Sequence, residues 1–202
     1  MTTAHDLFII ALDLEQPVGQ GDLSLALAGA ELIDLIGAGA VAVDGDQILP
    51  GGLPPGDRFL GEAAAGLTRQ APHERIEDWL WRRGRDLSAA YQAALEESGE
   101  LKPHRSGRLS FGSKTLEPVD TPARDRAAER WADKEPILTA LVAALGTDDE
   151  ASGDGSDNES GLDDESVTIV VAAVHDAVME LEAVRQRRAI ENAAFANVWR
   201  AP

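Results

Sequence analysis

Three arginines and one tryptophan within five residues are the feature of the sequence best suited to chemistry. Arg82, Arg83 and Arg85 follow Trp81 near the end of an expected helix. Guanidinium groups pair with phosphate or carboxylate in a planar fork, so the cluster could bind an anionic group. A charge run at a helix end is also typical of a solvated surface that complements the helix dipole. Both interpretations stay open. Trp81 and Trp79 cannot share one helix face, so Trp81 is expected to face a groove, a partner or lipid.

Other patterns that could carry chemistry are incomplete. The four histidines have no partner at i+4 and no zinc-ligand spacing, and the chain has no cysteine. It also has no G-x-S-x-G motif for a nucleophile. Glu31 and Asp34 lie one helical turn apart, but with 36 acidic residues such pairs arise by chance, and a solvated face is expected. We therefore predict a non-enzymatic protein with no catalytic residue, no metal site and no cofactor.

Two glycine patterns resemble phosphate-binding loops. Residues 37–42 fit G-x-G-x-x-A, but that motif needs a strand before it and a helix after it. Here a helical pattern comes first, and an Asp44-Gly45 hairpin signal follows. Residues 107–114 resemble a P-loop, yet Ser113 precedes Lys114 in reversed order. We interpret residues 37–39 as the end of a helix and discard the P-loop.

The elements that would position the arginine cluster are mostly helices. Residues 7–12 form a short apolar run, either a buried strand or a piece of helix. Cap and stop signals include Asp22, Asp57, Gly99 and Thr121. Apolar spacing predicts helices over residues 23–36, 58–68, 74–82, 86–98, 121–131 and 136–145, and one that follows residues 167–171. The fold class is mainly α: a single globular helical domain with one or two β-hairpins, built from residues 1–145 and 167–202.

Residues 146–166 differ from the rest of the chain. They contain nine acids, no base and many Gly and Ser residues. Such a stretch cannot bury enough apolar area to offset the entropy lost on ordering. We predict an acidic disordered loop inside the helical domain.

The overall charge limits the partners. A net charge of -18 repels nucleic acid and anionic lipid at long range, although residues 69–114 hold nine of the 18 Lys and Arg residues. No apolar run reaches the roughly 18 residues needed to span a bilayer, and the first 17 residues lack the Lys or Arg of a secretory signal. The 15 Arg against three Lys indicate a GC-rich, bacterial genome. We expect a cytoplasmic protein whose membrane contact is peripheral, on the inner membrane face.

The order of several segments resembles the Golgi phosphoprotein 3 family and its bacterial relatives. The segments are "LFIIALD", "LALAGAELIDLIGAGAVAV", "LPPGDRFLGEA", "RIEDWL", "LEESGEL", a Phe-bearing hairpin and "RDRAAERW". The match runs from about residue 7 to residue 145. The resemblance implies a mostly helical fold. Eukaryotic members bind phosphatidylinositol 4-phosphate at Golgi membranes and act as adaptors, so it also implies a peripheral adaptor that binds an anionic lipid headgroup.

The resemblance also implies site residues. The family pocket uses one Trp and three Arg; Arg85 matches one arginine, whereas Ala28 and Ser88 occupy the other two positions. Residues 19–23, where the family has the Trp, contain no aromatic residue. We predict Arg85 and its neighbours Trp81, Arg82 and Arg83 as the lipid-binding residues.

The hairpin beside that pocket serves membrane contact and self-association in the family. The resemblance gives this role to residues 104–115, with Arg108, Leu109 and Phe111 in contact with the membrane or a second copy. Two alternatives stay open. One is a cytosolic protein–protein scaffold without lipid binding. The other is a winged-helix-like nucleic-acid binder, because a basic hairpin follows the helix that ends at Gly99. The acidity of the chain argues against this alternative, so we expect no nucleic-acid partner.

Overall fold

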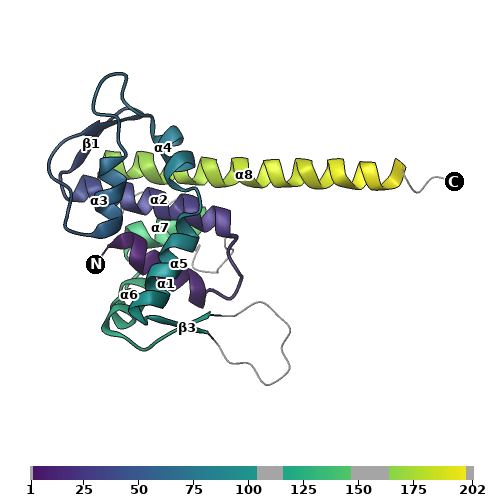
Figure 1. Cartoon of the computed structure of the whole chain (residues 1–202), viewed down its shortest axis with the longest axis horizontal. Helices are drawn as coiled ribbons and strands as arrows, with labels where there is room; N and C mark the ends of the chain where they lie inside the picture. Colours follow the sequence, from purple (N-terminus) through teal and green to yellow (C-terminus); the bar gives the residue numbers. More distant parts are fainter. Residues whose placement is uncertain (1, 104–115, 147–163, 199–202) are drawn as a thin grey trace.

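The structure is a computed structural model that describes residues 2–103, 116–146 and 164–198. The described residues form eight helices and two antiparallel sheets of two strands each, so the fold is mainly α, as expected. A central helix, α2 (Gln20–Gly37), packs against most of the others (Figure 1). Its helical neighbours are α1 (Thr3–Asp13), α3 (Arg58–Ala65), α4 (Ile76–Arg83), α5 (Leu87–Ser98), α7 (Pro136–Ala144) and α8 (Glu165–Val198).

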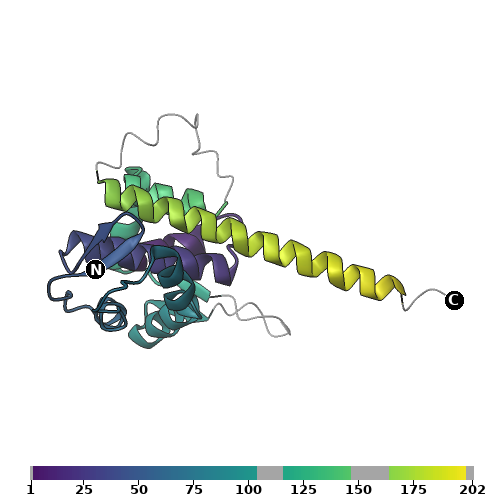
Figure 2. The same ribbon diagram turned by 90° about the horizontal axis from the view of Figure 1, so that it is seen from above.

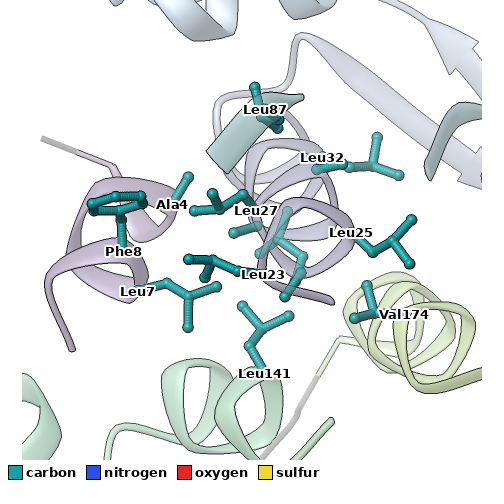
Figure 3. Packing of buried hydrophobic residues seen from close by; sticks show 14 of the residues in the cluster. Ala4, Leu7, Phe8, Leu23, Leu25, Leu27, Leu32, Leu87, Leu141 and Val174 are labelled. Atoms are coloured by element: carbon teal, nitrogen blue, oxygen red, sulfur yellow. The ribbon is translucent and has the colours of Figure 1, made fainter. Parts of the chain in front are cut away.

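The core surrounds α2. Its leucines point in several directions: Leu23 lies between Leu7 of α1 and Leu141 of α7, while Leu25 lies beside Val174 of α8 (Figure 3). Close packing requires a small residue where α2 meets α8. A Cβ at Gly29 would lie 2.3 Å from a methyl group of Val174, so a larger side chain there would push α8 away.

Residues 7–12 are helical, which decides between the two interpretations of that run. They lie in α1, whose start is capped by the Thr2 hydroxyl, which accepts from the His5 amide. Helix α1 contacts α2, α5, α7 and α6 (Pro122–Ala132), so apolar residues are buried around most of its circumference. That all-round burial hides the helical period in the sequence.

Most predicted helix ends are confirmed. The Asp57 carboxylate accepts from the Leu60 amide at the start of α3, and the Thr121 hydroxyl accepts from the Arg124 amide at the start of α6. Helix α5 ends at Ser98, and Gly99 follows it in the left-handed region.

The predicted cap of α2 is wrong. The helix begins three residues earlier than expected, so its N-cap is Gly19 and Asp22 lies in its first turn. The Asp22 carboxylate instead pairs with Arg185 of α8. The capping signal was misleading because the true partner of Asp22 lies 163 residues away.

The first hairpin follows α2 as predicted. Strands β1 (Val41–Asp44) and β2 (Gln47–Pro50) pair with Val43 opposite Ile48. Gly45 supplies the positive φ of 59° at the turn. A helix therefore precedes residues 37–42 and a strand follows, the reverse of a nucleotide-binding loop.

The stem of a second hairpin follows α5. Strands β3 (Leu101–Pro103) and β4 (Leu116–Pro118) pair with Lys102 opposite Glu117. The predicted contact residues Arg108, Leu109 and Phe111 lie outside the described residues, as do positions 147–163 of the expected acidic loop. Helix α8 begins at Glu165, so the last two positions of that expected loop are helical.

Helix α8 both packs and projects. Its first half crosses α2, and its C-terminal half extends away from the other helices (Figures 1 and 2). Residues 186–192 are all exposed. The point at which α8 leaves the other helices lies near the start of α2, where Arg185 meets Asp22.

Candidate functional site

The four predicted lipid-binding residues separate into two groups. Trp81 and Arg85 line one hollow, whereas Arg82 and Arg83 do not. The hollow measures about 520 Å³ and lies between the starts of α2 and α5, with α8 at one side. Its other lining residues are Gln20, Gly21, Ser24, Leu25, Gly84, Asp86, Ser88, Ala89 and Leu181.

Arg83 forms an ion pair with a buried carboxylate, that of Glu31. Its Nε and Nη2 donate to the two oxygens of Glu31 at 2.6 and 3.0 Å, and Nη2 also donates to the carbonyl of Phe59. The Tyr91 hydroxyl donates to the same carboxylate at 3.1 Å. Burial raises the pKa of both Glu31 and Tyr91, against the opposing effect of Arg83 on Glu31. Arg83 therefore joins α4 to α2.

The expectation of a solvated face for Glu31 and Asp34 is wrong. Glu31 is 0% exposed, and its carboxylate accepts hydrogen bonds from Arg83 and Tyr91. Asp34 is partly buried and accepts from the Ala4 amide, which ties α2 to the start of α1. Burial raises the pKa of Asp34. Both carboxylates hold helices together.

Arg82 also has a partner away from the hollow. Its Nε and Nη2 donate to the Glu74 carboxylate at 2.6 and 2.7 Å, and its guanidinium lies 5.2 Å from the ring centroid of Trp79. Trp79 itself is fully buried and donates from Nε1 to the carbonyl of Ala28. Helix α4 thus turns Trp79 inward and Trp81 toward the hollow, as the two-residue spacing predicted.

Arg85 differs from both of its neighbours. Gly84 ends α4, and Arg85 follows in the connection to α5, where it is exposed. It makes no hydrogen bond or ion pair with any other residue that the structure describes. Its guanidinium is therefore available to a ligand in the hollow.

Two hydroxyls close the floor of the hollow. Ser24 of α2 donates to the Ser88 hydroxyl at 2.9 Å and accepts from the Ser88 amide at 3.0 Å. The Ser88 hydroxyl donates in turn to the carbonyl of Gln20 at 3.0 Å. Both serines are buried. Ser88 therefore fastens α5 to α2.

The starts of two helices border the hollow. Neither Gly19 at the start of α2 nor Asp86 at the start of α5 provides a side-chain cap. Backbone N–H groups at a helix start favour an anion. The carboxylate of Asp86 opposes this effect, so attraction of an anion to the hollow depends on the positive charge of Arg85.

A second, apolar hollow adjoins the first. It measures about 320 Å³ and shares Gln20 and Ser88 with the hollow of Arg85. Its lining includes Phe8, Leu12, Leu14 and Val18. No signal in the sequence pointed to this apolar groove, because its lining is assembled from α1, the loop that follows, α2 and α5.

Two further features bear on the site. The described parts of the chain contain no group of three or more His, Cys, Asp or Glu side chains placed to hold a metal ion. Within residues 2–103, 116–146 and 164–198, no helix combines the length and apolar character needed to cross a membrane.

Comparison with protein-family models identifies the family of the chain. The family model described as Golgi phosphoprotein 3 (GPP34) matches residues 4–181, most of the chain. No curated protein matches the chain significantly. The matched range includes nearly all of α1, α2 to α7 and the first half of α8; Arg185 and the projecting part of α8 lie beyond it.

Proposed function

Because the chain belongs to the Golgi phosphoprotein 3 family, we propose that it is a non-enzymatic peripheral membrane adaptor that binds an anionic lipid headgroup in the hollow of Arg85. The family resemblance implies phosphatidylinositol 4-phosphate as the headgroup. The observation that carries the proposal is the contrast within α4 and the residues after it. Arg82 and Arg83 are paired with carboxylates, whereas Arg85 lines a hollow and has no partner among the described residues.

The chemistry around Arg85 suits a phosphate group. A guanidinium can donate two parallel hydrogen bonds to phosphate oxygens. The start of α2, which has no side-chain cap, adds backbone N–H groups on the same side. Trp81 contributes a ring with one polar N–H, the kind of side chain that settles at a membrane–water interface.

The apolar groove supports a lipid rather than a small free anion. It adjoins the hollow at Gln20 and Ser88 and extends toward Leu12 and Val18. An amphipathic ligand or a membrane surface would meet charge at one end and apolar side chains at the other. A free anion would leave the groove unused.

Because the chain is strongly acidic, attraction to an anionic membrane must be confined to one face of the protein and must be sensitive to salt. With a formal charge of -18, most of the surface repels an anionic bilayer. Attraction must come from the face that carries Arg85 and Trp81. We propose a location in the cytoplasm and on the inner face of the membrane, which the protein contacts through its Arg85 and Trp81 surface.

Vesicle flotation tests the proposal. Three vesicle types are compared: neutral lipid, generic anionic lipid, and neutral lipid with phosphatidylinositol 4-phosphate. We expect preferential binding to the phosphoinositide vesicles. Equal binding to both anionic types would overturn the assigned headgroup, and no binding to any vesicle would overturn the lipid function and favour the protein scaffold.

Self-association through the second hairpin is the remaining part of the proposal. Strands β3 and β4 form its stem, and residues 104–115 connect them outside the described residues. Changing Leu109 and Phe111 to Asp is expected to remove any concentration dependence of the mass measured by sedimentation. A mass that rises with concentration equally in both proteins would contradict this role.

A further inference from the structure

A second guanidinium stands beside the hollow of Arg85. Arg185 lies one helical turn after Leu181, a residue of α8 that lines the hollow. Its Nη1 donates to both oxygens of Asp22 in the first turn of α2, at 2.8 and 2.7 Å. Its Nη2 lies 3.0 Å from the position that a Cβ would take at Gly21, another lining residue.

The ion pair leaves part of this guanidinium unused. Nη1 donates to Asp22 and also lies 3.6 Å from the Glu182 carboxylate, while Nη2 makes no hydrogen bond to any residue within the described ranges. A guanidinium has five N–H donors, so two carboxylates at one nitrogen do not exhaust it. The Arg185 side chain is 39% exposed, against 11% for Asp22. Arg185 is therefore held by a buried carboxylate and still open to solvent beside the hollow.

Gly21 allows this arrangement. Because Gly21 has no side chain, the guanidinium can lie against the backbone at the start of α2. A Cβ there would also meet a methyl group of Leu181 at 2.8 Å, so even alanine would displace the side chains of Leu181 and Arg185. The start of α2 is thus shaped to receive the Leu181 and Arg185 turn of α8.

We infer that Arg185 is a second cation for the phosphate group bound by Arg85. This inference rests on the proposed function and deepens it, because it assigns a binding residue that lies outside residues 4–181 of the family match. A phosphate monoester carries between one and two negative charges near pH 7 and offers three acceptor oxygens. One guanidinium cannot satisfy all of them, and two on adjoining elements can.

The competing explanation is purely structural: Arg185 could serve only to fasten α8 to α2. Two substitutions separate the explanations because each breaks the same ion pair. Arg185→Gln removes the cation, whereas Asp22→Asn keeps the cation and removes a competing carboxylate. If Arg185 only fastens α8 to α2, both variants should lose similar amounts of vesicle affinity. If Arg185 binds the phosphate group, Arg185→Gln should lose affinity and Asp22→Asn should not.

The experiment measures the affinity of the full-length protein for vesicles containing phosphatidylinositol 4-phosphate. Arg187→Gln is the matched control, since Arg187 is an exposed arginine on the same helix, about 200° around the axis from Arg185. We expect Arg185→Gln to weaken binding about tenfold, the order of one hydrogen bond to a charged group. Arg187→Gln should stay within about twofold of wild type, the weak effect of a single exposed charge.

Asp22→Asn is expected to bind at least as tightly as wild type. Equal affinities of the Arg185→Gln and Arg187→Gln proteins would overturn the inference. So would an Asp22→Asn protein as weak as Arg185→Gln. Competition with inorganic phosphate distinguishes the source of the ligand. Vesicle binding is measured in phosphate and in chloride at the same ionic strength, and a lipid site requires the vesicles to remain bound in phosphate as they do in chloride.

The test also separates this inference from the proposed function. Failure of the wild-type protein to bind vesicles would overturn the proposed function itself. Binding that is lost in Arg85→Gln but intact in Arg185→Gln would leave the proposed function standing and overturn only the role of Arg185.

Discussion

The guanidinium of Arg83 lies in a bidentate contact with Glu31, 2.6 and 3.0 Å from its two carboxylate oxygens. Glu31 is 0% exposed and Arg83 is 16% exposed, so the pair is shielded from water. The contact joins α4 to the central helix across 52 residues of sequence. An arginine that looked suited to ligand binding is instead an internal strut.

The first prediction concerns this strut. Glu31→Gln keeps the shape of the side chain but leaves the Arg83 cation without its buried counter-charge. Breaking such a pair from one side typically costs about 3–5 kcal/mol. We expect a loss of this order in the free energy of unfolding measured with urea.

Arg82→Gln is the control for that measurement. Arg82 also pairs with a glutamate, but its side chain is 45% exposed, so the loss should be about 1 kcal/mol or less. Equal losses in the two variants would contradict the distinction between a buried strut and a surface pair.

The second prediction concerns acid stability. Burial by itself raises the pKa of Asp6, whereas contacts with His5, Arg126 and Arg130 lower it to about 2. A lowered pKa stabilises the folded state above the unfolded value near 4, and this contribution is lost as the pH falls from about 4 to about 2. The shift from 3.8 corresponds to about 2 kcal/mol.

Asp6→Asn should therefore show a smaller fall in the free energy of unfolding than wild type between pH 4 and pH 2. Asp13→Asn is the control, because Asp13 forms an exposed pair with Arg124 and should retain the wild-type pH dependence. A wild-type slope in the Asp6→Asn protein would show that Asp6 is not a source of the acid lability.

The third prediction concerns Ser88, at a position where the resemblance to the family implies an arginine. Ser88 and Ser24 exchange hydrogen bonds in a buried contact between α5 and α2. Ser88→Arg should not restore a binding residue; it should destabilise the fold, because a long charged side chain replaces a buried hydroxyl. Denaturation midpoints and vesicle affinity of this variant would be measured together, and tighter binding at unchanged stability would refute the prediction.

The fourth prediction separates the two side chains of the hollow. Trp81→Ala removes an interfacial ring without changing charge, so vesicle binding should weaken severalfold while its dependence on salt stays the same. Arg85→Gln should weaken binding and also flatten the salt dependence. Affinities at two ionic strengths for both variants test this, and identical salt profiles would mean that the two residues do not have distinct roles.

The helices were predictable where the signals are local. Asp57, Thr121 and Gly99 mark helix ends because a cap needs only residues within one turn. Asp22 carries the same type of signal but is used in a contact with Arg185, far away in sequence. Residues 7–12 stayed undecided because burial on most sides of α1 removes the amphipathic pattern.

The site was only partly predictable for the same reason. Spacing alone placed Trp81 on a different face from Trp79, and the structure brings it to the hollow with Arg85. Which arginine remains unpaired depends on Glu31 and Glu74, and neither contact follows from a local pattern. Leu181 could not be assigned to the hollow because it comes from the other end of the chain.

The central claim is that Arg85, and not the neighbouring arginines, binds an anionic headgroup. The most direct test is flotation of the wild-type, Arg85→Gln and Arg82→Gln proteins with vesicles containing phosphatidylinositol 4-phosphate. Both substitutions remove one exposed positive charge, so they change the overall charge equally. The account predicts that Arg85→Gln strongly reduces flotation while Arg82→Gln floats like wild type. Equal flotation of the two variants would contradict it.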